Sequence, residues 1–337
     1  MTEETLSGVK YTNKFMVASV TVMFSLLLSG CAQRYSMAYS DNVSDSTYGI
    51  AAQPIETNDK ADSFASVLCV TDSSGETAAS ETPDLYGASA AALFDVNNKK
   101  CLFSTDIYTR HYPASMTKIM TAIVALKNAS TDKVLTASDT VNTLDADAQS
   151  CGIASGDTMT LDQALHLLLV NSANDAAIMI AEGIGGSIEG FTQMMNEEAD
   201  SLGATATNFV NSNGLSDQNH YTTAYDMYLI FNDAIKYDKI KECINMSSYQ
   251  TVYHDSTGAD KDVSVNATDQ YINGNHSTPS GVTVIGGKTG TTNDAGHCLI
   301  LLSNDTSGNP YISIVMQAQD TDSLYGAMDS LLSLIPN

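Results

Sequence analysis

The sequence predicts an α+β domain whose antiparallel sheet takes strands from both ends of the chain, with a helical subdomain inserted between them. Two observations support this prediction. Short apolar runs typical of strands occur at 88–105 and return at 282–317. In the region between them, apolar residues recur at the three-to-four-residue spacing of amphipathic helices.

The expected strands of the N-terminal part lie at 88–95 and 101–105, on either side of a turn at Asn97-Asn98. The C-terminal part is expected to supply three further strands and a closing helix, at 282–287, 297–303, 311–317 and 323–334. Turn-forming residues at 304–310 separate the last two strands. Together these runs would complete one sheet.

The inserted helices are recognised by their first residues. Thr160 and Gln163 have the spacing of a capping box, which opens a helix through Val170. Ser187 is the expected N-cap of a further helix, and Gly203 stands where that helix would end.

Residues 1–31 have the pattern of an export signal. Lys10 and Lys14 precede an apolar run at 15–28, which is shorter than the ~20 residues of a membrane-spanning helix. The run ends in Leu-Ser-Gly-Cys, which resembles a bacterial lipobox, in which the cysteine, here Cys31, is diacylated. We therefore expect an exported protein, lipid-anchored at the outer face of the cytoplasmic membrane. The alternative is an uncleaved N-terminal anchor with an incidental cysteine.

Residues 32–81 are rich in Ser, Thr, Asp and Ala and have no helical or strand period, which predicts a flexible tether. The folded domain is expected at 82–337. The formal charge of −24 repels phosphate backbones, so nucleic acid is excluded as a partner.

Cysteine and histidine patterns argue against a metal site. The sequence has no C-x-x-C pair and no H-E-x-x-H, so neither a metal nor a cofactor is expected. An odd number of cysteines follows Cys31, so at least one thiol is free and the pairing of the others stays open. These are Cys69, Cys101, Cys151, Cys243 and Cys298.

Two short motifs offer a nucleophile and its partners. Ser115 and Lys118 lie three positions apart at the start of an expected helix, and therefore on one face. A lysine whose pKa is lowered by burial can take the proton of a serine nucleophile. Between two later helices, Ser172 offers a hydroxyl to relay protons and Asn174 an amide to bind a peptide group.

The third motif is Lys288-Thr289-Gly290, at the end of an expected strand. A cation, a hydroxyl and bare backbone suit the docking of a substrate carboxylate. Alone, each motif has an ordinary explanation. The S-x-x-K spacing arises by chance and recurs at Ser7 and Ser130. Asn174 could be an ordinary helix N-cap, and Lys288 a solvated lysine before a turn. Only the ordered set of three indicates an active site.

That ordered set resembles the penicillin-binding protein and serine β-lactamase superfamily. Longer stretches are similar to the low-molecular-mass D-alanyl-D-alanine carboxypeptidases, at 112–121, 168–177, 213–215, 220–226 and 287–292. The resemblance covers 82 to the C-terminus and implies a β-lactamase/transpeptidase-like fold. The chain ends soon after the expected closing helix, so we expect it to lack the all-β C-terminal domain of many relatives.

The resemblance implies a role for each motif. Ser115 would attack the carbonyl between two terminal D-alanines, and Lys118 would accept its proton. Ser172 would pass a proton to the departing D-alanine, while Asn174 orients the acyl chain. β-Lactams, which mimic the dipeptide, should acylate Ser115.

The resemblance also implies a carboxylate site and an oxyanion hole. Lys288, Thr289 and Gly290 would bind the terminal carboxylate of a peptidoglycan stem peptide. The backbone N–H groups of Ser115 and Thr291 would stabilise the oxyanion.

Three alternatives stay open. A class A β-lactamase needs a glutamate to position the deacylating water, yet no Glu lies between Glu198 and Glu242. An endopeptidase acting on cross-links would use the same motifs. A catalytically silent wall-binding module would have no need of the Ser115–Lys118 pair.

Overall fold

A computed structural model describes residues 68–71, 74–79 and 81–336. Its main sheet has the order β2-β1-β9-β8-β7, and every neighbouring pair is antiparallel. The strands are β1 (Ala90–Asp95), β2 (Lys100–Thr105), β7 (Thr283–Thr292), β8 (Gly296–Asn304) and β9 (Pro310–Ala318). β1 pairs directly with β9, with Ala92 opposite Ile314. The predicted joining of the two ends of the chain in one sheet is thus confirmed.

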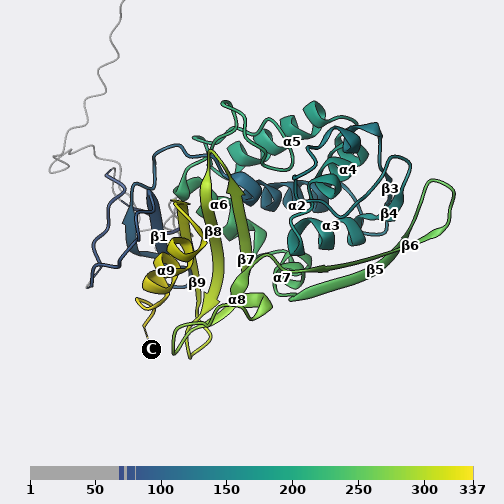
Figure 1. The fold of residues 1–337 in the computed structure, drawn as a ribbon. Coiled ribbons are helices and arrows are strands. Elements are labelled where there is room, and N and C mark those ends of the chain that lie inside the picture. Colours follow the sequence, from purple (N-terminus) through teal and green to yellow (C-terminus); the bar gives the residue numbers. More distant parts are fainter. Residues whose placement is uncertain (1–67, 72–73, 80, 337) are drawn as a thin grey trace, which may run out of the picture. The chain divides into compact units, whose positions relative to one another are not determined.

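The two faces of this sheet are covered by different helices, as alternating side chains require. Leu93 and Val315 face a cluster that includes Leu324 and Met328 of α9 (Thr321–Leu332). Phe94 and its even-numbered neighbours belong to the larger core on the opposite face, which includes α6 (Ala224–Ala234). Figure 1 shows α9 against the β8–β9 part of the sheet.

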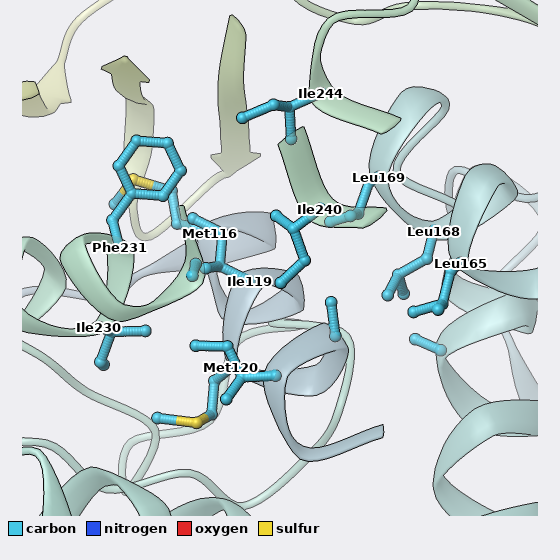
Figure 2. Close-up of a cluster of buried hydrophobic side chains, with 14 of the residues drawn as sticks. Met116, Ile119, Met120, Leu165, Leu168, Leu169, Ile230, Phe231, Ile240 and Ile244 are labelled. Carbon is cyan, nitrogen blue, oxygen red and sulfur yellow. The ribbon is translucent and has the colours of Figure 1, made fainter. Parts of the chain in front are cut away.

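The helical insert surrounds one buried helix, α2 (Thr117–Asn128), in which every residue from Thr117 to Ala125 is buried. A helix buried on all its faces belongs to a core, and the buried residues of α2 are mostly apolar. Figure 2 shows its side chains among those of α3, α6 and α7. The other helices of the insert are α3 (Leu161–Val170), α4 (Asn174–Gly185), α5 (Ile188–Ser201), α7 (Asp238–Ile244) and α8 (Gln270–Asn273), with a short 3₁₀ turn, η2 (Asp139–Thr143).

Local signals fixed several helix ends as expected. Thr160 and Gln163 form the capping box of α3. Ser187 caps α5 by accepting a hydrogen bond from the Gly190 N–H, and Gly203 follows its end with φ +82°. The helix expected from Ser115 instead opens as a 3₁₀ turn, η1 (Ala114–Met116), before α2 begins.

A second sheet was not predicted. It has the order β3-β4-β5-β6 and joins β3 (Val134–Thr136), β4 (Thr158–Thr160), β5 (Ser248–His254) and β6 (Asp260–Asn266). β3 and β4 are only three residues long, and the β5–β6 hairpin is largely exposed. None of these four strands therefore gives a strong apolar pattern in the sequence.

The described residues that precede 82 belong to the folded domain, so the boundary expected there was placed too late. Cys69 is fully buried, and its N–H donates to the Tyr228 hydroxyl at 2.9 Å. Thr77 forms an antiparallel bridge with Ser104 of β2. The expected signal at 1–31, its Cys31 and the rest of the tether lie outside the described residues.

The cysteine pairing that the sequence left open is resolved: the five cysteines after Cys31 are all free thiols. Cys69, Cys243 and Cys298 are buried. Across the described ranges, no helix is both long and apolar enough to cross a membrane.

Candidate active site

Ser115 lies in the η1 turn at the start of the buried helix α2. The residue before it, Ala114, has φ +46°, a conformation that non-glycine residues rarely adopt. The Ala114 carbonyl accepts a hydrogen bond from the Thr117 hydroxyl at 2.8 Å. This strained turn brings Ser115 to the wall of a cavity.

Lys118, one turn along α2, is completely buried behind Ser115. Its Nζ lies 3.0 Å from Ser115 Oγ, 2.8 Å from Asn174 Oδ1 and 2.5 Å from the Asn213 carbonyl oxygen. Burial, helped by the charge of Lys288, lowers the pKa of Lys118 well below its usual range.

A neutral amine at this position has two N–H groups and one lone pair. The two carbonyl oxygens, of Asn174 and Asn213, accept only, so they take the two N–H groups. The lone pair then faces the Ser115 hydroxyl at 3.0 Å. The arrangement can therefore remove a proton from Ser115 Oγ.

The α3–α4 loop supplies Ser172 and Asn174. Ser172 has φ +65° and is almost fully buried, and its side chain lines the cavity that Ser115 lines. The sequence left open that Asn174 is simply the N-cap of the next helix, but it is not. The cap is Ala173, without any side-chain bond, and the Asn174 amide reaches Lys118 instead.

Strand β7 forms the opposite wall and carries Lys288, Thr289, Gly290 and Thr291. These residues lie inside the strand, which runs five residues beyond the predicted end at 287. A Cβ at Gly290 would lie 2.9 Å from the Pro113 oxygen and 3.0 Å from the Ser115 nitrogen. Gly290 therefore lets the strand pass directly against the η1 turn, where a side chain would push the two walls apart.

Lys288 is also buried, with 1% of its surface exposed. Its Nζ donates to the Thr289 carbonyl oxygen at 2.9 Å. Burial lowers the pKa of Lys288 to about 7, against an opposing effect of Asp269. Asp269 is itself buried, which raises its pKa to about 6. The Thr289 hydroxyl lies 2.6 Å from that of Thr268.

The walls enclose a cavity of about 250 Å³. It is lined by Ser115, Gln149, Ser172, Thr268, Gln270, Thr289, Gly290, Thr291, His297, Thr321, Leu324 and Tyr325. All predicted site residues within the described ranges are thus brought together: five line the cavity, and Lys118, Asn174 and Lys288 lie buried in its walls. No Asp or Glu is among the lining residues, which come from the described part of the chain.

Sequence reasoning assigned no role to several neighbours of this site. Asn213 contributes a backbone carbonyl, which leaves no signal in the residue type. Gln149 and Thr268 reach the cavity through long-range topology. The stretch 213–215 was noted only for its family resemblance, and its Asn-Gly pair marks a tight turn.

Known proteins resemble this chain in sequence and in fold. Residues 76–320 match the peptidase S11 family, described as D-alanyl-D-alanine carboxypeptidase. Over 221 residues, 64% of this chain, it is 33% identical to the D-alanyl-D-alanine carboxypeptidase DacF of Bacillus subtilis. Over 70% of this chain, it is 28% identical to DacA of Haemophilus influenzae. The matches cover 53% and 58% of these relatives, so the chain spans little more than half of their length.

Among solved structures, the Streptomyces K15 DD-transpeptidase has a similar fold, with a TM-score of 0.69. The alignment covers 75% of this chain and 98% of that one, at 24% identity. At this identity the likeness establishes the fold alone.

Proposed function

This chain belongs to the D-alanyl-D-alanine carboxypeptidase family, and from that premise we propose that it removes the terminal D-alanine from peptidoglycan stem peptides. The observation that carries the proposal is the contact of Lys118 Nζ with Ser115 Oγ in the wall of a cavity. A buried lysine beside a serine hydroxyl has a clear use in acyl transfer.

The proposed reaction has two halves. In the first, Lys118 takes the proton of Ser115, whose Oγ attacks the carbonyl between the two D-alanines. The backbone N–H groups of Ser115 and Thr291 stabilise the oxyanion, an effect typically worth about 10²–10³-fold per donor. The C–N bond then breaks, Ser172 passes a proton to the departing amine, and an ester on Ser115 remains.

In the second half, water hydrolyses the ester and restores Ser115. A β-lactam enters the same first half: its ring C–N bond breaks, the ring nitrogen takes a proton, and an ester forms on Ser115. Because the amine stays attached to the acyl group, it cannot leave the cavity as D-alanine does.

Lys288 and Thr289 supply recognition of the terminal carboxylate in this proposal. With a pKa of about 7, the buried Lys288 is only partly charged in the empty site. A bound carboxylate would favour its protonated form, so binding and protonation reinforce each other. Gly290 leaves the backbone of β7 accessible beside them.

The test is release of D-alanine from diacetyl-Lys-D-Ala-D-Ala by the full chain. We expect one D-alanine per peptide, and no L-alanine from the diacetyl-Lys-D-Ala-L-Ala control. Equal release of the terminal alanine from both peptides, or none from either, would contradict the proposal.

A class A-like β-lactamase is disfavoured because no Asp or Glu lines the cavity among the described residues. Asp217, in the segment where such a residue would be sought, instead accepts a bond from the Asn219 N–H at 2.8 Å. Nitrocefin hydrolysis at many turnovers per second would reverse this assignment. Assays on cross-linked muropeptides address the endopeptidase alternative.

We also propose that Cys31 is diacylated and holds the exported enzyme at the outer face of the cytoplasmic membrane. The support is the apolar run at 15–28 followed by Leu-Ser-Gly-Cys. In a bacterial host, palmitate labelling of the wild-type chain should disappear in Cys31→Ala. Unchanged labelling in that variant would contradict lipidation at Cys31.

A further inference from the structure

We propose that His220 is a positioning residue for acylation: through the Thr117 hydroxyl it holds the Ala114 carbonyl, and with it the turn that aims Ser115 at its substrate. The inference rests on the proposed chemistry at Ser115. His220 lies 105 residues from Ser115 in sequence and acts on it only through the intervening groups.

A continuous set of hydrogen bonds connects His220 to the turn. The Val210 N–H donates to His220 Nδ1 at 3.1 Å. His220 Nε2 lies 2.8 Å from Thr117 Oγ1, which lies 2.8 Å from the Ala114 carbonyl oxygen. All of the side chains in this connection are buried.

The directions of these bonds follow from the first one. A nitrogen that accepts from a backbone N–H carries no proton, so the neutral ring has its proton on Nε2. Nε2–H therefore donates to Thr117 Oγ1, and the hydroxyl hydrogen of Thr117 is left for the Ala114 oxygen. Burial lowers the pKa of His220 to about 4, against the opposing charge of Asp217, so this neutral form persists at ordinary pH.

The carbonyl at the end of this connection belongs to a strained residue, since Ala114 has φ +46°. Gly214 presses on the same oxygen, because a Cβ there would lie only 1.9 Å from it. The neighbouring Asn213 carbonyl binds Lys118. The Ala114 carbonyl is thus fixed by close backbone packing and by the Thr117 hydrogen bond.

Removing the hydrogen bond would allow the strained turn to relax. Ser115 follows Ala114 directly, so both its Oγ and its N–H would shift relative to Lys118 and β7. A displacement of ~1 Å in a catalytic group can cost about 10²-fold in rate. If the role of His220 were purely structural, its removal would lower stability and leave the turnover of the folded protein unchanged.

The experiment compares matched variants of the full chain. Thr117→Val removes the hydroxyl at nearly constant shape, and Thr117→Ser keeps it. His220→Phe removes both ring nitrogens and retains an aromatic ring. For each we would measure the thermal midpoint, the rate constant of acylation by benzylpenicillin, and kcat and KM for D-alanine release.

We expect Thr117→Val and His220→Phe each to lower acylation and kcat by ~10- to 100-fold, with KM nearly unchanged. Thr117→Ser should stay within about threefold of wild type, because it restores the donor and acceptor. The Val/Phe double variant should be no slower than the slower single variant, since both break one connection.

If folded Thr117→Val is acylated by benzylpenicillin at the wild-type rate, the inference is overturned, even if His220→Phe fails to fold. Losses that multiply in the double variant, or a Thr117→Ser variant as slow as Thr117→Val, would also overturn it. A wild-type chain that forms no adduct and releases no D-alanine would overturn the proposed function, and the inference with it.

Discussion

Lys118 and Lys288 are both buried at the walls of one cavity, yet the protein holds them differently. Lys118 Nζ has three hydrogen-bond partners: the Ser115 hydroxyl in η1, the Asn174 amide oxygen at the start of α4, and the Asn213 carbonyl. Lys288 has one, the carbonyl of the adjacent Thr289. Across the described residues, no carboxylate lies within ion-pair distance of either nitrogen.

The two environments suit the two lysines to different roles. Two fixed acceptors, Asn174 Oδ1 and the Asn213 carbonyl, define the position of Lys118 and direct its lone pair toward Ser115, as a base requires. Lys288 is buried with a single hydrogen bond, and because burying an unpaired charge is unfavourable, its pKa of about 7 leaves it only partly charged. In the proposed reaction, the substrate carboxylate pairs with its charged form. We therefore propose that the helical wall (η1, α2 and the α3–α4 loop) supplies the base, and that the sheet wall (β7) binds the substrate carboxylate.

The largest expected effect comes from the helical wall. Lys118→Ala removes the base, so acylation by benzylpenicillin should fall by ~10²- to 10⁴-fold. Lys127→Ala is the matched control, because Lys127 lies on the same helix but pairs with Glu198 at the surface. If benzylpenicillin acylates Lys118→Ala as fast as the Lys127→Ala control, Lys118 is not the base.

A smaller loss is expected from the sheet wall. Lys288→Met should lower kcat/KM for a peptide with a free terminal carboxylate by about 10- to 100-fold, the value of a charged hydrogen bond. The same peptide with an amidated terminus should be equally poor with both proteins. If Lys288→Met lowers kcat/KM for both peptides alike, Lys288 does not recognise the carboxylate.

The two lysines also predict a bell-shaped pH profile of kcat/KM. Activity should fall at acid pH as Lys118, whose pKa is lowered, becomes protonated and stops acting as a base. It should fall again above about pH 7 as Lys288 loses its charge. The alkaline limb should disappear in Lys288→Met, and a limb that persists there belongs to another group.

The smallest expected effect is on stability. The pKa of Lys288 in the folded chain is about 7, below the usual 10.5, so the folded state binds fewer protons between these values. Stability should rise with pH across this window, because the buried charge is disfavoured below it. Lys288→Met should therefore raise the thermal midpoint more at pH 6 than at pH 9. An equal shift at both pH values would contradict this.

The sequence predicted the parts of the site that depend on local spacing. Ser115 and Lys118 lie three positions apart and were expected on one helix face, whereas the meeting of the three motifs was expected from the resemblance of their ordered set to a known family. The backbone around them could not be predicted in the same way. The positive φ of Ala114 and the Asn213 carbonyl arise from packing between segments about 100 residues apart, which leaves no local pattern.

The same reasoning applies to the fold. The main sheet was predictable because β1, β8 and β9 are buried and apolar along most of their length. The second sheet was missed because β3 and β4 are three residues long. The residues before 82 were assigned to the tether because their composition is polar, although Cys69 and Thr77 contact the domain.

The most direct test of the central assignment is peptide-mapped mass spectrometry of the full chain after incubation with benzylpenicillin. We expect one stable penicilloyl adduct, located on Ser115 and missing in Ser115→Ala. An adduct on another residue, or no adduct while the penicillin remains intact, would contradict the assignment of Ser115 as the nucleophile.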